Sequence, residues 1–168
     1  MSDATLTQAR EQVLAAVSGK VRSPHVEAFF DEPTFTVSYV VHDPATKDAA
    51  IIDSVLDFDH AAGRTTFDSA DKIISYVREQ GLQVRWVMET HAHADHLSAA
   101  PYLQQELGGD LAIGSAILAV QDVFGKIFNE GSGFQRDGSQ FDRLLNDGET
   151  LMIGEIPLIA LHVPGHTP

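Results

Sequence analysis

The sequence of 168 residues contains no cysteine. This absence excludes disulfide bonds, thiolate metal ligands and a cysteine nucleophile. Any bound metal would be held by histidine and carboxylate side chains, a ligand set that suits zinc, iron or manganese. The lack of cysteine also fits a reducing compartment, so we expect a cytoplasmic protein.

Basic residues are scarce, with 11 lysines and arginines against 24 acidic residues and a formal net charge of −13. Such a surface repels a phosphate backbone, so we expect no nucleic-acid partner. No apolar run approaches the ~20 residues of a membrane span, so we expect no membrane partner. Residues 1–10 also lack the apolar core of a secretory signal. A homo-oligomer is left open.

The length and the hydrophobic fraction of 43% fit one domain with a sizeable core. Residues 4–18 have apolar side chains at helical spacing, and Gly19 would end that helix. We therefore expect a helical extension over residues 1–24 and a main domain over residues 25–168.

The main domain alternates strand and helix patterns, which predicts an α/β fold. A helix is expected from Asp68 or Ser69, capped by one of them, to Gln80, and a buried strand over 84–88 follows it closely. A parallel crossover connects such elements. The other strands are expected over 35–42, 49–55, 111–113, 149–153 and 156–163, and the other helices over 97–107 and 115–128, the last capped by Ser115.

Three histidines and one aspartate fall within six residues directly after the buried strand at 84–88: His91, His93, Asp95 and His96. The carboxyl end of such a strand is where α/β proteins place ligand sites. On an irregular loop, His91 and His93 can turn to one metal while Asp95 and His96 turn to a second point. Two such metals lie about 3.5–4 Å apart and share a bridging water.

A second histidine cluster, His162 to Thr167, also follows a predicted strand. Pro164 and Gly165 favour a turn there, which presents His166 as a further metal ligand. His162 alternates with apolar residues, and we expect it to pack beside the site instead of binding metal. For Asp53, near the end of a predicted strand, we favour a structural role.

At these residues the sequence resembles the metallo-β-lactamase superfamily, whose T-H-x-H-x-D-H and P-G-H-T motifs appear here as THAHADH and PGHT. The resemblance covers roughly residues 25–168 and implies an αββα sandwich with a metal site at one edge of its two sheets. Within the superfamily the chain resembles the branch of glyoxalase II and the persulfide dioxygenases. The A-D-H ending and the run H-V-P-G-H-T-P favour the dioxygenase side.

The resemblance implies a role for each matching residue. His91, His93 and His166 match the first metal site, and Asp95 and His96 match the second, with Asp95 the candidate catalytic residue. In persulfide dioxygenases a single iron is held by the residues matching His91 and His166 and by a later aspartate. Asp95 and His96 would then lie beside the iron without binding it.

The implied activity is oxidation of a small-thiol persulfide, such as glutathione persulfide, by iron and dioxygen. One alternative is thioester hydrolysis by a glyoxalase II-like site with two zinc ions. Another is a truncated, non-catalytic module of the same fold.

The family's metal-binding aspartate comes after the P-G-H-T segment, whereas this sequence ends at Pro168. We therefore expect a sandwich that is incomplete at its C-terminus, a fragment of a longer protein, and little turnover by residues 1–168 alone. The spacing from His96 to His166 is longer than in the glyoxalase II that the sequence resembles. We expect the extra length to lie between Ser115 and Phe141 and to shape the substrate entrance.

Overall fold

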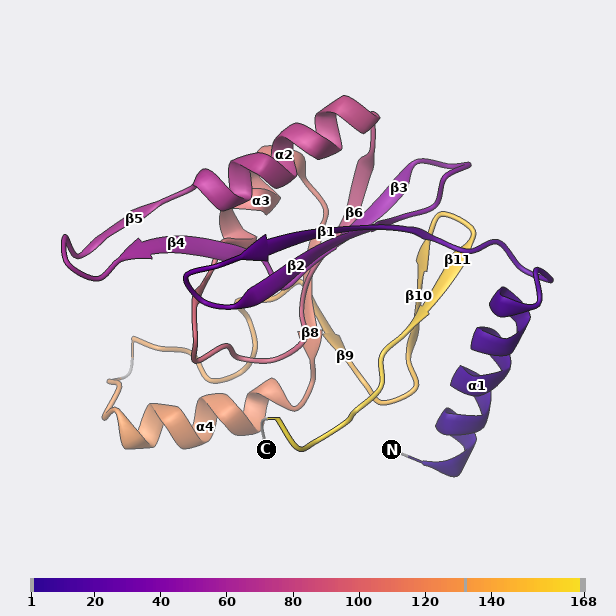
Figure 1. The fold of residues 1–168 in the computed structure, drawn as a ribbon. Helices are drawn as coiled ribbons and strands as arrows, with labels where there is room; N and C mark the ends of the chain where they lie inside the picture. The colour runs from indigo at the N-terminus through magenta and orange to yellow at the C-terminus, as the bar shows by residue number, and fades with distance from the viewer. Residues whose placement is uncertain (1, 132, 167–168) are drawn as a thin grey trace.

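The computed structural model describes residues 2–131 and 133–166, which form helices and strands in an alternating order (Figure 1). The elements are α1 (Asp3–Val17), β1 (His25–Asp31), β2 (Thr36–His42), β3 (Asp48–Ile52), β4 (Val55–Asp59), β5 (Arg64–Thr66), α2 (Asp68–Gln80), β6 (Gln83–Glu89), β7 (Leu97–Ser98), α3 (Ala100–Leu107), β8 (Asp110–Gly114), α4 (Ile117–Ile127), β9 (Arg143–Leu145), β10 (Thr150–Ile153) and β11 (Ile156–Ile159). In the described part of the chain, no helix combines the length and apolar character needed to cross a membrane.

The main sheet has six strands in the order β1-β2-β3-β6-β8-β9. The pairs β1–β2 and β2–β3 are antiparallel, and the pairs β3–β6, β6–β8 and β8–β9 are parallel. β3 and β6 are joined through α2, which confirms the predicted parallel crossover. Parallel pairing brings the carboxyl ends of β3, β6 and β8 to one edge of the sheet.

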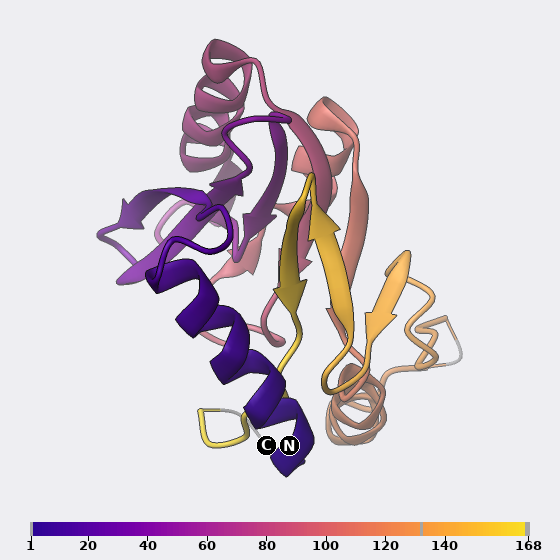
Figure 2. The same ribbon diagram turned by 90° about the vertical axis from the view of Figure 1, so that its right-hand side faces the viewer.

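The two faces of the sheet have different coverings, because successive side chains on a strand point to opposite faces. On one face, Val87 packs in a buried cluster with Ile73 of α2 and Leu103 of α3. On the other face, Met88 packs in a second cluster with Ile153 of the β10–β11 hairpin. Figures 1 and 2 show the hairpin lying against the sheet on the side away from α2 and α3. The order of layers is helix, sheet, sheet, which matches three layers of the expected sandwich.

The first helix forms where the sequence predicts it, but its apolar residues do not make a buried face. Leu14 and Val17 are 56% and 82% exposed, and the buried residue of α1 is Thr5. Ser2 caps the helix by accepting a hydrogen bond from the backbone N–H of Thr5 at 3.2 Å. The Gln8 amide reaches Thr150 of β10, so α1 lies along the outside of the hairpin (Figure 2).

Several strand predictions were incomplete. β1 was not predicted, and neither were the short strands β5 and β9. The strand expected over 49–55 ends at Ile52, because Asp53 adopts a left-handed backbone conformation with φ of 53°. The chain turns there and starts a new strand, β4, which pairs with β5 and β7 outside the main sheet. The strand expected over 156–163 ends at Ile159.

The predicted helix caps were wrong, although the helices themselves are present. α2 begins after Phe67 without a side-chain cap, and Ser69 instead donates from its backbone and its hydroxyl to Asp57 of β4. α4 begins after Ala116, while the Ser115 hydroxyl donates to Asn146 at 3.3 Å. α3 begins at Ala100 because Leu97 and Ser98 pair with β4. The hydroxyls of Ser69 and Ser115 thus bind a side chain distant in sequence instead of capping their own helix.

A buried carboxylate, Asp43, fastens the hairpin to the sheet. Its side chain is fully buried and accepts hydrogen bonds from Arg22 at 2.9 Å and from the backbone N–H groups of Ala45 and Glu155. Burial alone would raise the pKa of Asp43, but these hydrogen bonds hold it well below its usual range. The carboxylate therefore stays ionised and joins the segment after α1, the end of β2 and the β10–β11 turn.

Candidate metal centre

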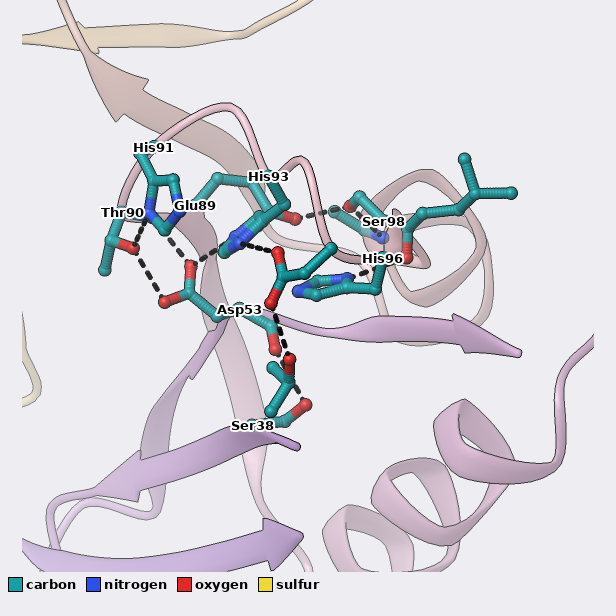
Figure 3. A network of polar contacts seen from close by, with 12 residues as sticks. Ser38, Asp53, Glu89, Thr90, His91, His93, His96 and Ser98 are labelled. Carbon is teal, nitrogen blue, oxygen red and sulfur yellow. Dashed lines mark hydrogen bonds and ion pairs between the residues drawn. The ribbon is translucent and has the colours of Figure 1, made fainter. Parts of the chain in front are cut away.

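The histidine motif occupies the loop between β6 and β7, at the carboxyl ends of the parallel strands. Glu89 is the last residue of β6, and Asp53 follows the neighbouring strand β3 directly. Figure 3 shows both carboxylates turned toward the loop. The motif therefore lies at the sheet edge where the sequence places it, and the metal site itself stays a prediction.

The structure brings four of the sequence-predicted histidines together. The ring centroids of His91 and His93 are 4.1 Å apart, and those of His93 and His96 are 4.2 Å apart. His166 arrives from the segment after β11, and its ring lies edge-on to that of His91 at 4.8 Å. Side chains that are far apart in sequence thus meet around His91.

The hydrogen bonds of His91 determine which of its nitrogens is free. The Thr90 hydroxyl donates to Asp53 Oδ2 at 2.8 Å, so its only hydrogen is used. The Thr90 hydroxyl oxygen also lies 2.8 Å from His91 Nδ1. Since that hydroxyl has no second hydrogen, it must accept a hydrogen bond from His91 Nδ1. Burial, together with the charge of His93, lowers the pKa of His91 and favours the neutral ring. Nε2 then carries a lone pair that a metal could bind.

His93 is hydrogen-bonded through Nε2, whereas His91 is hydrogen-bonded through Nδ1. Its Nε2 lies 3.0 Å from Asp53 Oδ1 and 2.9 Å from Glu89 Oε2, so it carries a proton and donates. Burial alone would lower the pKa of His93, but the hydrogen bonds and the charges of Asp53 and Glu89 raise it to about 9. Nδ1, 3.9 Å from Asp95 Oδ1, is the nitrogen left for a metal, which would take the place of its proton.

His96 and Asp95 complete a compact group with His93, whose potential ligand atoms all lie within 4.8 Å of one another. His96 Nδ1 donates to the Leu97 carbonyl at 3.0 Å, and its Nε2 is buried without a hydrogen-bond partner. Partial burial would raise the pKa of Asp95, but its own backbone N–H and the Thr36 hydroxyl lower it. An orphaned imidazole nitrogen beside an ionised carboxylate is a donor set that fits a divalent metal ion.

Asp53, Ser38 and Glu89 belong to this network but were not among the predicted site residues. Asp53 accepts from the Thr90 backbone N–H at 2.7 Å as well as from the Thr90 hydroxyl and His93, so it both ties down the loop and orients a histidine. Ser38 donates to the Asp53 carbonyl at 2.7 Å and supports its left-handed backbone. Glu89 was missed altogether, although a glutamate directly after three apolar residues at the end of a predicted buried strand is a sequence signal for a paired, buried charge.

A cleft of about 710 Å³ opens beside His91 and His166. Ile117, Val120 and Phe124 of α4 line one of its walls. His162 also lines it, and the backbone N–H of His162 donates to Asp147 at 3.0 Å. A smaller pocket of about 340 Å³ lies on the His93 and His96 side of the loop. The region after Ser115 therefore borders the histidines, and its expected role in shaping the substrate entrance stays a prediction.

Comparison with known proteins identifies the family. The model of the metallo-β-lactamase superfamily matches residues 31–168. A protein of Burkholderia pseudomallei named as a probable metallo-hydrolase is 57% identical over 143 residues, which are 85% of this chain and 49% of that protein. The mitochondrial persulfide dioxygenase of Homo sapiens is 26% identical over 168 residues, covering 100% of this chain and 54% of the enzyme.

Solved structures agree on the fold. A metallo-β-lactamase of Staphylococcus aureus superposes with a TM-score of 0.62 at 22% identity, over 88% of this chain and 36% of that one. The chain spans between about a third and about half of the length of the curated relatives it matches, from 33% to 54%. The layered α/β fold, the histidine loop at its sheet edge and the family match agree, and the chain belongs to the metallo-β-lactamase superfamily.

Proposed function

We propose that this chain carries the metal-binding part of an enzyme that uses iron and dioxygen to oxidise a small-thiol persulfide. The observation that carries the proposal is the meeting of His91 and His166, whose rings lie 4.8 Å apart at the wall of the larger cleft. These are the two histidines expected to hold a single iron. The similarity to a persulfide dioxygenase, which extends over all 168 residues, supports the same activity.

The chain's own residues would position the reactants. The hydrogen bonds among His91, Thr90 and Asp53 would fix the His91 ring, and apolar side chains of α4 line the space beside it. Asp95, ionised and held by Thr36, could accept a proton near the loop. Iron, when bound, would supply the redox chemistry that couples dioxygen to sulfur oxidation.

The second candidate is metal-dependent hydrolysis of a thioester. It is favoured by the orphaned Nε2 of His96 and by the short distances among His93, Asp95 and His96, which would suit a second metal. The relative named as a metallo-hydrolase points the same way. A two-metal site would supply a hydroxide nucleophile at neutral pH.

Metal content distinguishes the two candidates and needs no turnover. Protein purified without oxygen is expected to hold about one iron per chain, and Asp95→Asn is expected to keep it, because Asp95 lies beside the iron instead of binding it. Elemental analysis of both proteins provides the test. Two zinc ions in the unmodified protein, one of them lost in Asp95→Asn, would overturn the dioxygenase proposal in favour of the hydrolase.

A further inference from the structure

We propose that Glu89 is a positioning residue of the metal centre, which fixes the His93 ring and adds negative charge that draws a cation to the histidine loop. The inference rests on the proposed metal site at this loop. It assigns a function to a carboxylate that lies outside the THAHADH motif.

The contacts of Glu89 connect three parts of the site. Its side chain is only 6% exposed, and its Oε2 accepts from His93 Nε2 at 2.9 Å. Its other oxygen, Oε1, accepts from the Ser98 hydroxyl, and Ser98 Oγ in turn accepts from the Ala100 backbone N–H at 3.0 Å. Glu89 thus joins the end of β6, the histidine loop and the first residue of α3 (Figure 3).

Glu89 and Asp53 act on His93 in different ways. Asp53 is also bound by the backbone N–H and the hydroxyl of Thr90, so it holds the start of the loop whether or not His93 is present. Glu89 has no such contact with Thr90 among the described hydrogen bonds, and its oxygens are directed to His93 and Ser98. With both carboxylates on Nε2, the ring cannot turn Nδ1 away from Asp95 without losing two hydrogen bonds.

The negative charge of the two carboxylates is the second reason to assign Glu89 to the metal centre. Two carboxylates, the buried Glu89 and the partly buried Asp53, face a single imidazole, and the described ion pairs place no lysine or arginine on either of them. Buried negative charge without full compensation is costly, and a cation nearby lowers that cost. The His93 ring packs against His91 at 4.1 Å, so a divalent metal at the loop lies within reach of this field.

The test uses cobalt(II), a divalent ion whose absorption bands report its ligands, titrated against a competing chelator. Glu89→Gln, which keeps the shape but removes the charge, is expected to weaken cobalt binding about 10- to 100-fold and to change the visible spectrum. Glu79→Gln is the matched control, since Glu79 is exposed on α2. It should bind cobalt as the unmodified chain does, and circular dichroism should show that both variants are folded.

Unchanged affinity and spectrum in a folded Glu89→Gln variant would overturn the inference while leaving the metal site in place. If Glu89→Gln does not fold, Ser98→Ala replaces it, because it frees Glu89 Oε1 and is expected to weaken binding several-fold; unchanged binding there also overturns the inference. Failure of the proposed metal site is distinct, because the unmodified chain would then bind no cobalt, or His91→Ala would bind it equally well.

Discussion

Replacing His91 with alanine is expected to lower metal affinity by at least about 100-fold. His91 offers a lone pair on Nε2 because its Nδ1 is committed to Thr90, and both sequence interpretations place it on the metal. A site with few nitrogen ligands loses much of its affinity with one of them. The measurement is metal content after dialysis against a chelator.

The matched control for this variant is His60→Ala. His60 lies between β4 and β5, and its ring contacts Phe58 at 4.7 Å, away from the loop. It should keep the metal content of the unmodified chain. Full metal content in His91→Ala, with the fold intact, would show that the first site is wrongly assigned.

Replacing Asp53 with alanine is expected to lower both metal affinity, by roughly 10- to 100-fold, and the free energy of unfolding, by about 3 kcal/mol. The variant leaves the Thr90 N–H and the Thr90 hydroxyl without their acceptor, and it removes one of the two carboxylates that accept from His93 Nε2. It also places alanine at a φ of 53°, which alanine adopts less readily than aspartate does. Denaturant titration of the metal-free chain measures the loss of unfolding free energy, and chelator competition measures the loss of metal affinity.

The pKa of Asp53 sets the pH range of its contribution to stability. Burial alone would raise this pKa, but the hydrogen bonds from His93 and Thr90 lower it below the usual value. A carboxyl with a lowered folded-state pKa stabilises the fold above its unfolded pKa, near 4, and loses that effect as pH falls. The stability difference between the unmodified chain and Asp53→Ala should therefore narrow in acid. A difference that stays constant down to low pH would contradict the assigned hydrogen bonds.

The sequence predicted those elements whose signals are local. α2 was predicted from Ile73, Ile74 and Val77 on one face and from Gly81 as its stop, and the structure places these three residues in the core and Gly81 in the left-handed region. β6 was predicted as a buried strand over 84–88. Helical periodicity and apolar runs reflect burial of neighbouring residues, so they can be recognised without tertiary contacts.

Elements stabilised by distant partners were missed. β5 is exposed throughout, and its pairing with β4 determines its conformation. The residues of β1 alternate only weakly, and this strand is held at the sheet edge by β2. Ser69 and Ser115 looked like caps, but Asp57 and Asn146 bind their hydroxyls instead. Such choices depend on which groups meet in space, which a single sequence does not encode in its local pattern.

In the candidate site, too, the residues close together in sequence were predicted, and the carboxylates that the fold brings to them were not. The spacing of His91, His93, Asp95 and His96 is local and was recognised as a ligand set. The supporting carboxylates come from two different strands, and their meeting at His93 depends on the parallel pairing of β3 with β6. Asp53 was interpreted as structural, and the structure adds a hydrogen bond to a candidate ligand.

The central claim is that the hydrogen bonds around the loop decide which histidine nitrogens hold the metal. The most direct test is an anomalous-difference map from crystals of the metal-loaded protein, recorded at the absorption edge of the metal. We predict a peak at about 2.0–2.2 Å from Nε2 of His91, with Nε2 of His93 still directed to Asp53 and Glu89. A peak on Nε2 of His93, between Asp53 and Glu89, would contradict the account.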